Sequence, residues 1–168
     1  MAVGAPQLAS NLHGLDVVAW RELPDGRFAE RVPGALAFGP SEPTPAPTPP
    51  LVGLDAAGTA LLSWATSFYA GPAVLIQAAS RSAGGPWSAA ETLASSQALS
   101  TSSVSTVRLE VSPSGTALLV WQAGQSHYLH RGPAGQWSEI SLSGTQSALA
   151  PTAPVTSWRS PRDRFPSR

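Results

Sequence analysis

The chain has 168 residues, enough for one domain with a hydrophobic core, because domains commonly contain about 100–150 residues. Ten arginines balance ten acidic residues and lysine is absent, so the charge favours neither nucleic acid nor an anionic membrane as a partner. The lack of cysteine excludes disulfides, thiolate metal sites and a cysteine nucleophile.

The segment "MAVGAPQLAS" at the start of the chain has neither the basic nor the apolar region of a signal peptide, so we expect no such signal there. No apolar run approaches the roughly 18 residues of a membrane helix, and we therefore expect no membrane insertion.

A glycine followed six positions later by a tryptophan recurs along the chain. Three residues before each glycine is a side chain that accepts hydrogen bonds in Asx- or Ser-type turns, and an arginine and then an aromatic residue follow downstream. The copies of this pattern are Asn11, Gly14, Trp20, Arg31 and Phe38; Asp55, Gly58, Trp64, Arg81 and Trp87; and Ser112, Gly115, Trp121, Arg131 and Trp137. The constant order predicts three structural repeats within residues 1–143, at about 6–44, 50–94 and 104–143.

The beginning of each copy predicts a β-hairpin. An acceptor side chain at the first position and a glycine at the fourth favour a type I turn followed by a residue with positive φ. In the second copy, Ala60, Leu62 and Trp64 then alternate with Leu61 and Ser63, so both faces of the strand are largely apolar. We therefore expect this strand to be covered on both sides.

Each copy is predicted to contain four short antiparallel strands, because helical periodicity is weak and turn residues separate the apolar segments. The expected strands are 50–55, 59–66, 73–81 and 87–93 in the second copy and 106–111, 116–122, 126–131 and 137–142 in the third. The Pro-rich segment 41–50 is expected to be a long loop between copies. The predicted fold is all-β, each copy being one four-stranded blade of a partial β-propeller; a β-sandwich is the alternative.

Residues 144–168 are expected to begin an incomplete fourth repeat and to continue as an Arg-, Pro- and Ser-rich tail, which we predict to be disordered. Propellers typically close with about 4–8 blades, and three blades would leave apolar faces and strand edges exposed. We therefore expect either that the chain belongs to a longer propeller or that it self-associates to complete a ring.

The segments "LDAAGTALLSW", "AASRSAGGPWSAAETL" and "GALAFGPSEP" resemble the neuraminidase repeats of bacterial sialidase-like propellers, in the form common in actinobacterial surface and secreted proteins. The resemblance covers about residues 6–143 and implies a propeller fold and an extracellular or cell-surface location. The strict Asp-box of those enzymes, Ser-x-Asp-x-Gly-x-Thr-Trp, is absent from this sequence, so the resemblance implies the repeat rather than the activity.

Loops that differ in length between the copies are expected on one face of the predicted blades, and ligand sites often lie in such loops. Aromatic and short polar side chains there suit a carbohydrate or a peptide; the alternative is a set of ordinary solvated loop residues. The repeated tryptophans are expected to pack between copies, and the repeated arginines to take structural or solvated positions on the opposite face. The residues predicted to contact a ligand are Arg21, Phe68, Tyr69, Gln125 and His127.

No group of residues has the spacing of a catalytic or metal site. The histidines, His13, His127 and His130, lack a ligand spacing that a carboxylate completes, and neither Tyr69 nor Tyr128 has an identifiable acidic partner. We expect no catalytic residue, metal or cofactor. The predicted function is a non-enzymatic scaffold or recognition module for carbohydrate or protein; the alternative is a fragment of a sialidase-like glycoside hydrolase whose catalytic residues lie outside this chain.

Overall fold

The computed structural model describes residues 5–67, 73–97, 105–123 and 125–140, which form twelve β-strands and no helix. The predicted all-β class is therefore confirmed. No segment within these ranges is a helix that could cross a membrane. The strands are β1 (Gln7–Ser10), β2 (Asp16–Glu22), β3 (Asp25–Arg31), β4 (Glu42–Thr44), β5 (Leu51–Leu54), β6 (Ala60–Ser67), β7 (Ala73–Arg81), β8 (Glu91–Gln97), β9 (Ser105–Val111), β10 (Ala117–Ala123), β11 (Gln125–Arg131) and β12 (Trp137–Ile140).

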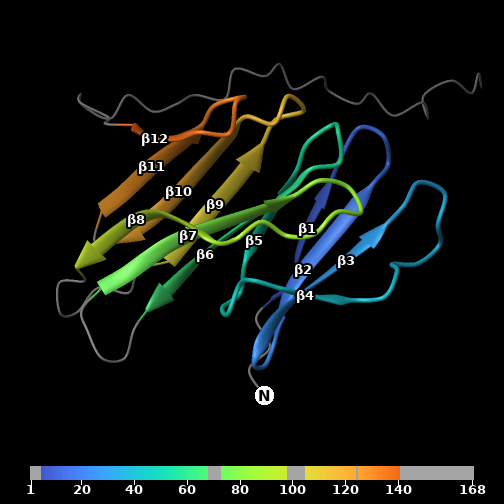
Figure 1. The fold of residues 1–168 in the computed structure, drawn as a ribbon, viewed down its shortest axis with the longest axis horizontal. Coiled ribbons are helices and arrows are strands. Elements are labelled where there is room, and N and C mark those ends of the chain that lie inside the picture. Colours follow the sequence, from blue (N-terminus) through green and yellow to red (C-terminus); the bar gives the residue numbers. More distant parts are fainter. Residues whose placement is uncertain (1–4, 68–72, 98–104, 124, 141–168) are drawn as a thin grey trace, which may run out of the picture.

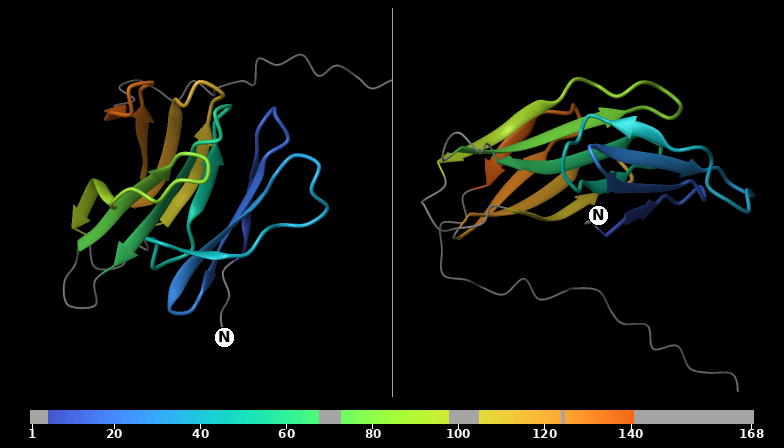
Figure 2. Two further views of the ribbon diagram at one scale, coloured as in Figure 1. Left: turned by 45° about the vertical axis from the view of Figure 1, so that its right-hand side comes forward. Right: turned by 90° about the horizontal axis from the view of Figure 1, so that it is seen from below.

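The strands form three four-stranded antiparallel sheets, each with its strands in chain order. The first sheet contains β1–β4, the second β5–β8 and the third β9–β12 (Figure 1). The second sheet lies between the other two, and the first strands of neighbouring sheets contact each other (Figures 1 and 2). Strands β5 and β9 approach so closely that a Cβ on Gly53 would collide with the side chain of Val111, so this position requires glycine.

Strand β6 is covered on both faces, as predicted. Ala60, Leu62 and Trp64 are buried in a cluster shared with the first sheet, and Leu61 is buried in a cluster shared with the third. Ser63, on the same face as Leu61, is also buried and donates a hydrogen bond to a backbone carbonyl of β7. Two apolar faces on one strand therefore give the molecule its central layer.

The second strands of the outer sheets are covered on one face only. In β2, Val17 and Ala19 are buried against the second sheet, whereas Trp20 on the opposite face is partly exposed. In β10, Leu119 is buried against the second sheet and Val120 is partly exposed. The first and third sheets thus each present an outward face that no described residue of another sheet covers.

The turn between the first two strands of each sheet has the predicted geometry. In the second sheet, Asp55 Oδ1 accepts a hydrogen bond from the amide of Thr59 at 2.7 Å, which closes the turn. The side-chain oxygens of Asn11 and Ser112 form hydrogen bonds within the equivalent turns of the first and third sheets. The turn glycines all have positive φ, with 78° at Gly14, 82° at Gly58 and 81° at Gly115.

Turns of neighbouring sheets are also hydrogen-bonded to each other. Asn11 Nδ2 donates to the carbonyl of Asp55 at 3.1 Å, linking the first turn to the second. The amide of Ala56 donates to the carbonyl of Pro113 at 3.1 Å, linking the second to the third. One end of the stack is therefore joined by polar contacts as well as by apolar packing.

Two strand predictions were wrong. The fourth strand of the second copy was expected at 87–93 but is β8, Glu91–Gln97, because Trp87 instead packs edge-on against the ring of Phe28, with 5.1 Å between centroids. The segment 41–50 was expected to be a loop but contains β4, which pairs with β3. Its Pro43 is tolerated because β4 is an edge strand, where a missing amide breaks no ladder.

Candidate functional site

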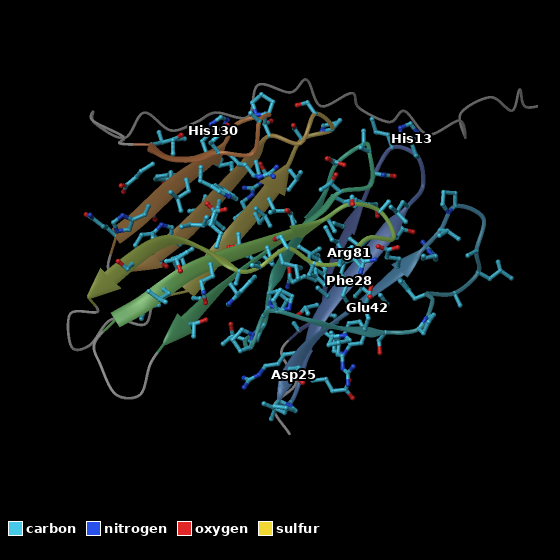
Figure 3. The ribbon with its side chains drawn as sticks, viewed as in Figure 1. His13, Asp25, Phe28, Glu42, Arg81 and His130 are labelled. Carbon is cyan, nitrogen blue, oxygen red and sulfur yellow. The ribbon has the colours of Figure 1, made fainter. Side chains whose placement is uncertain are left out.

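The repeated arginines end the third strand of each sheet, and their surroundings differ. Arg81 is buried between the first and second sheets, with 5% of its side chain exposed. It forms ion pairs with Glu30, at 3.1 Å between Nη2 and Oε1, and with Glu42 (Figure 3). Its guanidinium carbon lies 5.0 Å from the ring centroid of Phe28 and 5.4 Å from that of Trp87. Arg81 therefore joins two sheets by charge and by cation–π contacts.

Arg31 is paired inside its own sheet. Its guanidinium donates two hydrogen bonds to the carboxylate of Asp16 on the adjacent strand, with 2.8 Å between Nε and Oδ2. Hydrogen bonds from Ser10 and from Arg31 lower the pKa of Asp16 below its ordinary value of 3.8. The guanidinium carbon of Arg31 also lies 5.6 Å from the ring centroid of Phe38.

Arg131 has a different environment. Its Nη1 donates a hydrogen bond to the carbonyl of Gly115 at 3.0 Å, but within the described residues it forms no ion pair with an acidic side chain. It lines a groove of about 340 Å³ between the second and third sheets. We call this the Arg131 groove; its lining residues are Leu61, Ala78, Ala79, Ser80, Ser88, Ala89, Glu91, Arg131, Gly135 and Trp137.

Small residues on the second sheet explain why the groove is open. Three positions before the repeated arginine, the first sheet has Phe28 and the second has Ala78. One position before it, the first sheet has Glu30 and the second has Ser80. Phe28 and Glu30 fill the first interface by contacting Arg81. Ala78 and Ser80 offer neither a ring nor a carboxylate, and both line the groove instead.

The Arg131 groove combines a cation with an aromatic surface. A guanidinium recognises carboxylates with two parallel hydrogen bonds, and a partly exposed indole offers a flat apolar face with a polar edge. Trp137 is partly buried, while Ser88 and Glu91 at the margin are exposed and can bind polar groups. The groove therefore suits a polar ligand that carries a carboxylate and one apolar face.

The residues predicted to contact a ligand do not form one cluster. Arg21 lies on β2 in the first sheet, while Gln125 and His127 lie on β11 in the third, and the second sheet separates them. Phe68 and Tyr69 lie outside the described residues. The loop surface that these residues were expected to form stays a prediction.

His127 lies near the start of β11, an inner strand of the third sheet, and contacts residues of the strands on both sides. Its ring stacks on Trp121, with 4.1 Å between centroids and 12° between planes, and its Nδ1 lies 3.8 Å from Oε1 of Glu139. Trp121 itself is buried in the cluster between the second and third sheets. His127 is therefore a partly buried packing residue as well as a polar group near the predicted ligand face.

The repeated tryptophans take different positions. Trp64 is fully buried between the first and second sheets, and Trp121 is buried between the second and third. Trp20 faces away from the second sheet and is partly exposed. The tryptophans that follow the repeated arginines, Trp87 and Trp137, pack at the first and second interfaces respectively.

The described part of the chain contains no group of three His, Asp or Glu side chains placed to hold a metal ion. His13 is exposed in the first turn, and His130 is exposed on the outward face of the third sheet. Figure 3 shows these two histidines apart from each other.

The repeat pattern predicts a structural or solvated position for Arg131 and a structural role for Trp137, and it does not indicate the groove that both residues line. A signal was present, because aligning the copies on their arginines places Ala78 opposite Phe28 and Ser80 opposite Glu30. A loss of side-chain volume and charge at an interface position indicates an opening there.

Comparisons with known proteins add little to this geometry. No protein-family model matches the chain, and a search of the curated proteins gives no significant match. Among solved structures, a protein from Lactobacillus plantarum is similar, with 16% identity and a TM-score of 0.48. The alignment covers 80% of this chain and 40% of that protein, so this chain spans less than half of its length.

Proposed function

We propose that this chain is part of a β-propeller and acts as a non-enzymatic recognition module, with the Arg131 groove binding a carbohydrate that carries a carboxylate. The propeller interpretation is supported by four-stranded antiparallel sheets stacked in chain order and by a second strand buried on both faces. Blades of a propeller meet in this way because each must cover the apolar face of the next.

The observation that carries the ligand proposal is the difference between Arg131 and the other repeated arginines. Arg31 and Arg81 are each neutralised by carboxylates of the protein. Arg131 donates to a backbone carbonyl and leaves the rest of its guanidinium beside an open groove. A ligand carboxylate would provide the charge partner that the equivalent positions already have.

The aromatic residue favours a carbohydrate over an acidic peptide. Sugars present a flat C–H face that packs on an indole while their hydroxyls bond polar groups at the margin. Trp137 provides such a surface next to Arg131, with Ser88 and Glu91 nearby. A peptide carboxylate would use the arginine but would cover the indole only where an apolar or aromatic side chain is adjacent to it.

The test is binding of the full chain to an array of acidic and neutral oligosaccharides, followed by titration calorimetry with the best ligand. We expect acidic glycans to bind without turnover. Arg131→Gln should weaken binding about 10- to 100-fold, the loss expected for charge-assisted hydrogen bonds. Trp137→Ala should weaken binding to a similar extent.

Arg108→Gln is the matched control, because Arg108 is exposed and pairs with Glu110 away from the groove. This variant removes the same charge and should bind as the wild type does. Equal loss of binding in both variants would mean that only net charge matters, and release of product from a fluorogenic sialoside would contradict the non-enzymatic assignment.

A further inference from the structure

The outward faces of the first and third sheets carry residues at the repeat positions that form the interfaces between neighbouring sheets. On the first sheet, Leu8, Val18 and Ala29 lie side by side across β1, β2 and β3, opposite the face that meets the second sheet. Leu8 is exposed and Val18 is partly exposed. Trp20 and Phe38 extend this apolar surface, and both are partly or largely accessible to solvent.

This outward face presents the repeat positions that, in the other sheets, face the preceding sheet. Counted from the turn glycine, Trp20 is equivalent to Trp64, which packs against the preceding sheet. Arg31 with Phe38 is likewise equivalent to Arg81 with Trp87, the pair that contacts Phe28 of the preceding sheet. The first sheet therefore has the contact residues for a preceding sheet on a face where no strand of the described residues lies.

The outward face of the third sheet has the complementary positions. Tyr128 is equivalent to Phe28, since each lies three residues before the repeated arginine. It lies beside Val120 and Ile140 on neighbouring strands, and Ile140 is exposed. Next to this row is a hollow of about 470 Å³, lined by residues that include Glu110, Leu118 and His130.

The charged side chains near this contact are paired within their own sheets. His130 stands where the first sheet has Glu30, so the third sheet lacks the acid that pairs with Arg81 in the first interface. Arg31, the first-sheet equivalent of Arg81, does not need an acid from the third sheet, because Asp16 is already its partner. In the hollow, Glu110 already pairs with Arg108 of its own strand, as Arg31 pairs with Asp16 in the first sheet.

From this complementarity we infer that the outward face of the first sheet docks on the outward face of the third sheet of a second copy of this chain. The contact repeats the geometry of the interface between the first and second sheets, with Arg31 and Phe38 placed over Tyr128. Two chains that dock in this way at both ends form a ring of six sheets, within the range of about 4–8 blades found in propellers.

The test is the mass of the full chain by light scattering after size exclusion, over a range of concentrations. We expect twice the 17.3 kDa of one chain. Phe38→Glu and Tyr128→Arg should each reduce the mass to that of one chain without changing the circular dichroism spectrum. Mixing the two variants should restore a dimer, because one contact is then native and the other pairs a carboxylate with a guanidinium.

Leu36→Glu is the matched control, since Leu36 lies in the same connection as Phe38 but is fully exposed, and this variant should stay dimeric. A wild-type mass of one chain at all concentrations would overturn the inference. So would an oligomer that both face substitutions leave intact, or a mixture of the two variants that stays monomeric.

Discussion

The two interfaces between sheets have the same strand arrangement but differ in what fills them. Between the first and second sheets, Arg81 is enclosed by Phe28, Trp87 and two glutamates. Between the second and third, Arg131 faces a groove, because the equivalent residues of the preceding sheet are small. The comparison indicates that side chains at two positions of a repeat decide whether an interface is filled or contains a groove.

The largest effect should come from emptying the closed interface. Phe28→Ala removes a fully buried ring that contacts both Arg81 and Trp87, and should lower the free energy of unfolding by about 3–5 kcal/mol. Urea denaturation followed by tryptophan fluorescence measures this loss. Leu36→Ala, at a fully exposed position, should change it by no more than about 0.5 kcal/mol. A similar small change for Phe28→Ala would show that the first interface is not a packed core.

The next largest effect distinguishes Arg81 from Arg131 by what each contributes to the free energy of unfolding. Arg81→Leu leaves Glu30 and Glu42 without their cation, and should cost about 2–3 kcal/mol, less than a fully buried pair because both glutamates reach solvent. Arg131→Leu loses one hydrogen bond to a carbonyl and should cost about 1 kcal/mol or less. Equal losses in the same denaturation experiment would contradict the assignment of one arginine to structure and the other to binding.

A third experiment converts the open interface into the closed one. The double variant Ala78→Phe, Ser80→Glu places the first-sheet residues opposite Arg131 and Trp137, and should fill the groove and neutralise the arginine. Binding of an acidic glycan should fall at least about tenfold, equivalent to 1.4 kcal/mol. Calorimetric titration measures the affinity, and a circular dichroism spectrum checks that the sheets are intact. An unchanged affinity in the folded variant would place the ligand elsewhere.

The smallest expected effect is the pH dependence of stability that comes from Asp16, the ion-pair partner of Arg31 in the first sheet. The pKa of Asp16 is lower in the folded protein than in the unfolded chain, so its carboxylate stabilises the fold above its ordinary pKa. That stabilisation is lost as the pH falls through the lowered value. Unfolding free energies measured from about pH 5 to pH 2 should therefore fall more steeply for the wild type than for Asp16→Asn. Asp25→Asn, at the exposed first residue of β3, should follow the wild-type slope.

Much of the fold could be predicted from the sequence because the repeat fixes local geometry. The turn glycines, the acceptor side chains and the alternation in β6 each act within a few residues, and most predicted strands agree with the observed ones to within a residue or two. The position of β8 could not be predicted, because Trp87 packs on Phe28, far away in sequence.

The Arg131 groove was missed for a related reason. A groove forms where side chains are too small to fill an interface, and no local pattern marks this. The acids that pair with Arg81 come from β3 and β4 of another sheet, so the sequence alone does not show that Arg81 is neutralised and Arg131 is not. Comparison of the copies at Phe28, Ala78 and Tyr128 would have indicated which interface is open.

The hydrogen bond between the turns of the second and third sheets joins two backbone groups, the amide of Ala56 and the carbonyl of Pro113. The corresponding link between the first and second turns is made by a side chain, the amide of Asn11. A single substitution at Asn11 can therefore remove the first link, whereas the second keeps its donor and acceptor under every substitution except proline at position 56, so the two junctions differ in their tolerance of mutation.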